Sequence, residues 1–140
     1  MLFRSEMNCD LSKPWIKTQK VTQLDNQKFI INRTQRYTNA YISYYFLKSI
    51  QDKFVFLGTK SEHEIFSSTF NLEIQYLETE NFLELAEKMQ QFGGGVYNQS
   101  FLWHLADAMK LPRQFPGSSS CMLLSLKNFT CFSANIGGKA

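Results

Sequence analysis

The chain has 140 residues, of which 44% are hydrophobic, and this suffices for one globular core but argues against two full domains. Fifteen Lys and Arg against twelve Asp and Glu leave a formal net charge of +3. That charge is too small and too dispersed to indicate nucleic-acid binding, although it does not exclude an anionic small ligand. The sequence has no apolar run of signal-peptide length and none long enough to cross a membrane, so we expect a cytoplasmic protein.

Cysteine and aromatic content narrow the interpretation further. Cys9, Cys121 and Cys131 form no CxxC pair, and no Cys/His group has zinc-ligand spacing, so we expect free thiols and no metal site. Thirteen Phe, six Tyr and two Trp are a heavy aromatic load for this length. Some of these rings are expected to face a partner, which favours docking to another domain or formation of a homo-oligomer.

Four short apolar runs rich in β-branched and aromatic residues predict strands. They are Lys28–Asn32, Lys53–Gly58, Glu73–Leu77 and Gly94–Tyr97. Helical patterns alternate with them over Ala40–Ile50, from Ser61 to about Phe70, over Asn81–Phe92, and from Phe101 to Met109 before Pro112. Ser61 and Glu64 fit a capping box, and Asn81 is the cap candidate of the third helix. That helix is expected to bury the face formed by Phe82, Leu85, Ala86 and Met89.

The alternation of strand and helix between residues 28 and 110 is the pattern of parallel βαβ units. We therefore predict the α/β class, as a single Rossmann-like, three-layer α/β/α domain with a mostly parallel sheet in the order 3-2-1-4-5. The domain is expected over residues 28–115, after a lead-in of residues 1–27. Strands at Cys121–Lys127 and Asn128–Phe132 are predicted in the tail, residues 116–140, whose shortness indicates a truncated domain.

Polar residues follow the first and fourth predicted strands, in the loops 32–39 and 97–100. In the order 3-2-1-4-5 these strands are neighbours between which the chain reverses direction, and such sheets bind ligands at that point. A helix that starts near Ser100 would direct N–H groups at an anion, and Arg33 and Arg36 would face the same anion with donors suited to phosphate. The alternatives are ordinary helix capping by residues 98–100 and solvated loop charge at both arginines.

The segment Asn98–Pro112, NQSFLWHLADAMKLP, resembles the donor-site motif of heptosyltransferase-like glycosyltransferases of the GT-B fold. In that family a strand ends in Asp-Ser/Thr-Gly, and the following helix reads x-x-His-x-Ala-x-Ala-x-x-x-Pro. The residues in register are His104, Leu105, Ala106, Ala108 and Pro112, with Ser100 at the hydroxyl position. Gln99 stands where the family has the acid, and Phe101 stands where it has glycine. The resemblance extends over about residues 28–113.

The resemblance implies the C-terminal half of a two-domain enzyme, which binds a nucleotide sugar as its substrate and needs no cofactor. Catalysis would require an acceptor-binding domain or partner chain, so we expect no sugar transfer by this chain alone. The residues expected to hold the donor, or to brace the loops that do, are Asn32, Arg33, Thr34, Arg36, Asn98, Gln99, Ser100, Phe101 and His104. The alternative is a non-catalytic α/β module that binds a nucleotide or another phosphorylated small molecule, or that assembles with a partner.

Three further features have structural interpretations. Gly93–Gly95 precede a strand and are not followed by Gly-Lys-Ser/Thr, so they predict a helix stop and a turn rather than a phosphate-binding loop. His104 is expected to be a hydrogen-bonded core histidine that braces the loop before it. His63, between two glutamates, is expected to be a solvated surface residue.

Overall fold

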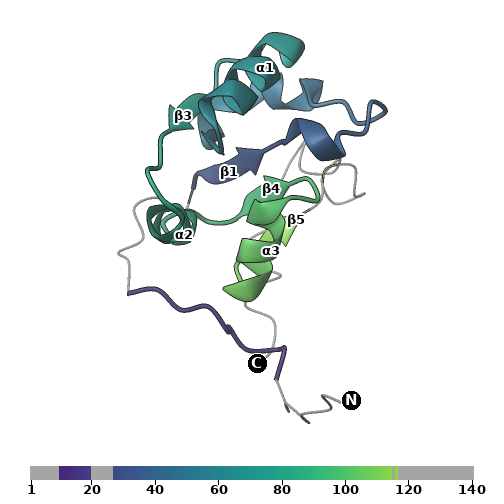
Figure 1. Cartoon of the computed structure of the whole chain (residues 1–140). Helices are drawn as coiled ribbons and strands as arrows, with labels where there is room; N and C mark the ends of the chain where they lie inside the picture. The colour runs from purple at the N-terminus through teal and green to yellow at the C-terminus, as the bar shows by residue number, and fades with distance from the viewer. Residues whose placement is uncertain (1–9, 20–26, 115, 117–140) are drawn as a thin grey trace.

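The structure is a computed structural model that describes residues 10–19, 27–114 and 116 (Figure 1). Its centre is a five-stranded sheet in the order β3-β2-β1-β4-β5, in which every neighbouring pair is parallel. The strands are β1 (Phe29–Asn32), β2 (Phe54–Leu57), β3 (Gln75–Leu77), β4 (Gly95–Tyr97) and β5 (Arg113–Gln114). The α/β class and the strand order predicted from the alternating pattern are therefore confirmed.

Register places β1 at the middle of the sheet. Ile30 of β1 lies opposite Val55 of β2 on one side and Gly95 of β4 on the other. All four residues of β1 and all four of β2 are buried. Strands covered on both faces are continuous apolar runs because neither side of the pleat meets water.

Helices cover both faces of the sheet and give three layers (Figure 1). They are α1 (Lys60–Phe70) on one face, with α2 (Phe82–Gln90) and α3 (Phe101–Ala108) on the other. Alternate residues of β1 divide between two clusters: Phe29 and Ile31 pack with the α1 residues Phe66 and Phe70, whereas Ile30 packs on the side of α2 and α3. The α2 and α3 side also contains Met89 and Leu105.

The cap of α1 differs from the prediction. Thr59, not Ser61, is the N-cap, and its hydroxyl accepts a hydrogen bond from the backbone N–H of Glu62 at 3.2 Å. The Glu62 carboxylate accepts in return from the Thr59 N–H at 3.0 Å, which completes a capping box. Two overlapping Ser/Thr-x-x-Glu patterns exist in this segment, and the structure uses the one that begins directly after β2 and Gly58. The helix ends at Phe70 as predicted, before Asn71 in the left-handed conformation.

The N-cap of α2 agrees with the prediction, but fewer residues of the helix are buried than predicted. The Asn81 side chain accepts from the N–H of Glu84 at 2.9 Å. Leu85, Ala86 and Met89 are buried, whereas Phe82 is 72% exposed. Phe82 is the first residue of the helix, and its ring packs against the exposed Phe101 rather than in the core.

The segment expected as an α-helix over Ala40–Ile50 instead forms 3-10 turns. Within it lies the 3-10 helix η2 (Tyr45–Ser49); the short η1 (Gln35–Tyr37) precedes the segment, and η3 (Gln51–Lys53) follows it. Consecutive i to i+3 hydrogen bonds join Leu47 to Tyr44 and Ile50 to Leu47. Tyr44 and Leu47 are buried and Ile50 is half-buried, so the apolar positions recur every three residues, the period of a 3-10 helix.

Two described segments were not among the predicted elements: the edge strand β5 and residues 10–19. β5 follows α3 after only four residues, with the N–H of Gly95 bonded to the carbonyl of Pro112 at 3.1 Å. The tail strands predicted at 121–127 and 128–132 lie outside the described residues. Residues 10–19 run below α2 and α3, and the N–H groups of Trp15 and Ile16 both reach the carbonyl of Ala108 (Figure 1). No helix among the described residues is long and apolar enough to cross a membrane.

Candidate functional site

The loops that follow β1 and β4 meet at the carboxyl edge of the sheet. β1 and β4 are parallel neighbours, with Asn32 opposite Tyr97 at their last paired position. The chain leaves β1 toward η1 and α1 on one face, and it leaves β4 into α3 on the other (Figure 1). The point of divergence predicted from the strand order is therefore present, and the polar segments 32–39 and 97–100 are its two sides.

Asn98 joins the two loops through its side-chain amide. Its Oδ1 accepts from the N–H of Thr34 at 3.1 Å, and its Nδ2 donates to the carbonyl of Thr34 at 2.9 Å and to the hydroxyl of Thr34 at 3.3 Å. The amide thus takes the place of one more rung of the β1–β4 ladder, because a carboxamide carries the same donor and acceptor as a peptide unit. The position of loop 32–39 relative to β4 is fixed by this contact.

Asn32 forms a second polar link inside the same edge. Its side chain is fully buried; Nδ2 donates to the carbonyl of Leu57 in β2 at 2.7 Å, and Oδ1 accepts from the hydroxyl of Ser100 at 3.3 Å. Within the described part of the chain, the buried polar side chains other than tyrosines are Asn32, Asn98 and Ser100. All three lie where β1 and β4 diverge, and all three are hydrogen-bonded.

Ser100 begins α3 but does not cap it with its side chain. Its backbone is extended, with φ −141° and ψ −179°, as expected of an N-cap residue. The hydroxyl, however, makes no capping hydrogen bond and is directed at Asn32. The predicted helix start is confirmed, whereas capping by the Ser100 hydroxyl is wrong, since that hydroxyl donates to Asn32.

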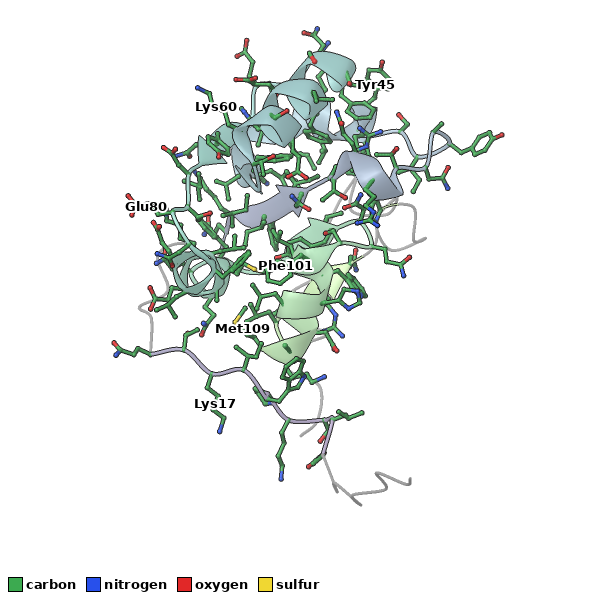
Figure 2. The ribbon with its side chains drawn as sticks, viewed as in Figure 1. Lys17, Tyr45, Lys60, Glu80, Phe101 and Met109 are labelled. Atoms are coloured by element: carbon green, nitrogen blue, oxygen red, sulfur yellow. The ribbon has the colours of Figure 1, made fainter. Side chains whose placement is uncertain are left out.

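The Arg33 side chain does not lie against the start of α3. The Arg33 guanidinium packs over the rings of Tyr44 and Phe70, at 5.8 and 5.2 Å from their centroids, on the α1 side of the sheet. These are cation–π contacts, which hold a charged group in one orientation without neutralising it. Arg33 is half-buried and Arg36 is exposed. Tyr45, which packs edge-on against Phe70, is seen beside α1 in Figure 2.

The remaining predicted site residues are on the surface or in the loop contacts already described. Gln99 is exposed, and Thr34 is half-buried against Asn98. Phe101 is 51% exposed and lies on the side of α3 that faces α2 (Figure 2). Its ring is 4.9 Å from that of Phe82, with an angle of 49° between the ring planes. Two exposed aromatic rings at the starts of neighbouring helices are a feature that the helical pattern did not reveal.

The two histidines exchange the roles expected of them. His104 is exposed on α3 and so does not brace the loop from the core. His63 is half-buried: its Nε2 lies 2.8 Å from the carbonyl of Ile74, and its ring stacks on Tyr76 at 5.1 Å. His63 therefore holds the segment before β3 against α1 and is not a solvated residue.

Packing requires glycine at two positions, one after β2 and one at the start of β4. Gly58 has φ +151°, and a Cβ there would lie 2.6 Å from the Asn32 Nδ2. A Cβ on Gly95 would lie 2.1 Å from the hydroxyl of Tyr97, because the Tyr97 ring folds back over the strand. Gly95, the first residue of β4, thus provides room for a buried ring, whereas Gly93 and Gly94 lie between α2 and β4, where a helix stop and a turn were expected.

Among the described residues, those with a shifted pKa do not form an acid–base pair at the carboxyl edge. In the described residues, carboxyl groups with a lowered pKa are Asp10, Glu84 and Asp107, held mainly by hydrogen bonds from Ser12, from the backbone of Glu80 and from Lys110 respectively. None of them belongs to loops 32–39 or 97–100. Burial raises the pKa of Tyr97. The described residues also hold no cluster of three His, Cys, Asp or Glu suited to a metal ion.

Comparison with protein-family models, curated proteins and solved structures found no match to this chain. The α/β class consequently rests on strand order and direction, and the resemblance to glycosyltransferases rests on the motif of residues 98–112 alone.

Proposed function

We propose that the chain binds a phosphorylated nucleotide ligand at the carboxyl edge where β1 and β4 diverge, and that this ligand is a nucleotide sugar. The observation that supports this most is the clustering of Asn32, Asn98 and Ser100 at that edge. Buried polar side chains need hydrogen-bond partners, and these three find theirs in the two loops and strands that border this edge. Parallel sheets of this order bind their ligands at this place.

The start of α3 offers the anion-binding part of the site. Backbone N–H groups in the first turn of a helix lack intrahelical acceptors, and together they carry a partial positive charge. Since Ser100 makes no capping bond, a phosphate oxygen would accept from the N–H groups of Phe101 and Leu102. The buried Ser100 hydroxyl serves the position of the helix and not direct contact with the ligand.

Arg33 would act at longer range in this arrangement. Its guanidinium is held on two rings on the α1 side of β1, so it contributes a fixed positive charge to the edge. Arg36 is exposed on η1 and is the arginine that a ligand in the loop would meet with planar donors. The anion would thus be bound by α3 on one side and by η1 on the other.

In glycosyl transfer this half would stabilise the leaving group. The bond between the anomeric carbon and the diphosphate breaks, the acceptor oxygen forms the new bond, and the acceptor proton passes to a base. Donors aimed at the diphosphate lower the barrier because its negative charge grows as the bond breaks. The acceptor and the base would come from an acceptor-binding domain or a partner chain, as in the two-domain glycosyltransferases that residues 98–112 resemble.

A thermal-shift series tests this function directly. We expect ADP, UDP and their sugar conjugates to stabilise the chain, whereas free sugars do not. A ligand at 100 times its Kd adds about 2.7 kcal/mol to the free energy of unfolding through linkage. Absence of stabilisation by every nucleotide diphosphate at millimolar concentration would refute nucleotide binding. Stabilisation by inorganic pyrophosphate alone would reduce the function to that of a phosphate-binding module.

The exposed pair Phe82 and Phe101 favours a second candidate function, assembly with a partner. Together with Leu83, 61% exposed, these side chains form an apolar group at the starts of α2 and α3. Exposed apolar groups of this kind mark interaction sites. Light scattering of the wild type and of Phe82→Ser tests it, with Tyr41→Ser, a fully exposed ring in the loop before η2, as the control. A wild type that is monomeric in light scattering would refute assembly of the chain with a second copy of itself.

A further inference from the structure

Charged residues are segregated along the chain. Residues 27–51 contain no Asp or Glu, and their cations are Lys28, Arg33, Arg36 and Lys48. Residues 73–87 contain no Lys or Arg, and their carboxylates are Glu73, Glu78, Glu80, Glu84 and Glu87. The modest net charge of +3 therefore conceals one basic and one acidic segment. Such a distribution favours contact between complementary parts of different molecules.

The sheet separates the two segments within one molecule. In the basic segment, Tyr44 and Leu47 pack in the same core cluster as the α1 residue Phe66. In the acidic segment, Leu85 and Met89 of α2 pack in the cluster on the other face. Figure 2 accordingly shows Tyr45 and Glu80 on different sides of the molecule. Contact between the basic and the acidic segment thus requires two molecules.

The basic segment presents two cations and an aromatic ring around Phe70, the last residue of α1. The Arg33 guanidinium lies 5.2 Å from the centroid of the Phe70 ring, and the exposed Tyr45 packs edge-on against that ring at 5.7 Å. Lys48 follows Tyr45 by three residues in η2, so the two exposed side chains share one side of this 3-10 helix. Within the described residues, neither Arg33 nor Lys48 has an ion-pair partner. We call Arg33, Tyr45 and Lys48 the basic surface.

The acidic segment carries a carboxylate beside an apolar group. Phe82, Leu83 and Phe101 are exposed at the starts of α2 and α3, and the two rings are in contact. The Glu84 carboxylate is already paired with a lysine, whereas Glu80 is exposed and has no ion pair with any described residue. We call Glu80, Phe82, Leu83 and Phe101 the acidic surface. It combines an apolar centre with a negative border, which complements an aromatic ring flanked by cations.

We propose that a second copy of this chain covers the acidic surface, and that it does so with its basic surface. This inference rests on the assembly proposed above, whose partner it names, and it is independent of nucleotide binding. The Tyr45 ring of one molecule covers Phe82 and Leu83 of the next, while Arg33 and Lys48 face Glu80. Because two different surfaces meet, the contact is heterologous and can repeat into rings or chains. Few side chains take part, so the assembly is weaker than that of interfaces burying about 800 Å² per partner.

Sedimentation velocity of the full chain over a concentration series tests the contact. We expect wild-type species larger than a dimer that dissociate in 1 M salt, where charges more than about 3 Å apart are screened. Phe82→Ser weakens assembly by about tenfold, and Lys48→Glu weakens it by about fivefold. Lys60→Glu makes the same change in net charge at an exposed lysine away from Tyr45, and it leaves assembly unchanged (Figure 2). Equal effects of the two lysine substitutions would overturn the proposal.

Mixing two variants shows which surfaces meet. Phe82→Ser/Leu83→Ser keeps the basic surface, and Tyr45→Ser/Lys48→Glu keeps the acidic one; all four side chains are exposed, so both variants should fold. Each variant alone should be monomeric, and an equimolar mixture should form a complex of two copies and nothing larger. A wild type that stops at a dimer, with no complex in the mixture, means that like surfaces meet; self-assembly then stands and this inference fails. A wild type that is monomeric throughout overturns both, and nucleotide titration of that monomer still decides the ligand site.

Discussion

Replacing Asn98 perturbs the contact that joins the two loops of the site. Asn98→Ala removes the hydrogen bonds of 2.9 and 3.1 Å to the backbone of Thr34 and the longer one to its hydroxyl. A protein hydrogen bond contributes about 0.5–1.5 kcal/mol, and the longest of the three contributes least. We therefore expect a loss of about 2 kcal/mol in the free energy of unfolding. For an m value of about 2 kcal/mol/M, the urea midpoint falls by about 1 M.

Asn98→Asp separates the two directions of the same contact. The new carboxylate still accepts from the N–H of Thr34 but can no longer donate to its carbonyl, and it places a buried charge against that oxygen. Burial and the facing carbonyl raise the pKa of the new carboxyl. As the pH falls from 7 to 4 the carboxyl becomes protonated and can donate, so the Asn98→Asp variant regains stability relative to wild type. Gln99→Ala, at the exposed neighbour, is the matched control. An Asn98→Ala variant within about 0.5 kcal/mol of that control would refute the assigned link.

Three other predictions follow from single contacts. Thr59→Ala should lower the free energy of unfolding by about 1 kcal/mol, whereas Ser61→Ala changes it by less than about 0.5 kcal/mol; equal effects in urea unfolding would contradict the capping box at Thr59. Gly95→Ala should cost about 1–3 kcal/mol by forcing the Tyr97 ring out of its place, and an unchanged thermal midpoint would disprove that packing. Burial raises the pKa of Tyr97 above the ordinary phenol pKa of 10.0. The contribution of Tyr97 to the free energy of unfolding is therefore fully present below pH 10.0 and is lost as the pH rises above it. Tyr97→Phe should reduce that loss in pH-dependent unfolding, and an identical alkaline profile would contradict it.

The sequence predicts the sheet well because strands that are buried on both faces are short, continuous runs of apolar residues. The runs around Ile30, Val55 and Val96 are apolar throughout, and their alternation with helices restricts the connections to parallel crossovers. The order 3-2-1-4-5 then places the loops after β1 and β4 together. The position of the site therefore follows from local patterns and topology alone.

Side-chain partners across the sheet edge do not follow from local patterns. Ser100 is a residue type that commonly caps helices, but its hydroxyl donates to Asn32, which is distant in the chain. Arg33 stands beside Asn32 in the sequence, but alternation along the strand turns it to the α1 side, where two rings hold it. His63 lies between glutamates and yet packs on Tyr76. Each difference comes from a contact between residues that neither periodicity nor spacing relates.

The helical prediction over Ala40–Ile50 is wrong for a different reason. Its apolar residues were assigned to a period near 3.6, but Tyr44, Leu47 and Ile50 recur at intervals of three. Over two turns the two periods differ by only about one position, so the sequence alone does not distinguish them. The hydrogen bonds between these residues settle the period in favour of 3-10 turns.

Amide chemical-shift mapping by NMR tests the central claim most directly. ADP and UDP are titrated into the uniformly 15N-labelled chain, and the shifted backbone amides are assigned. Our account predicts the largest shifts at Phe101 and Leu102, in the first turn of α3, with further shifts in loop 32–39 and none at Trp15, which contacts the last residue of α3. Shifts confined to residues outside the carboxyl edge, or no shifts at millimolar nucleotide, would contradict it.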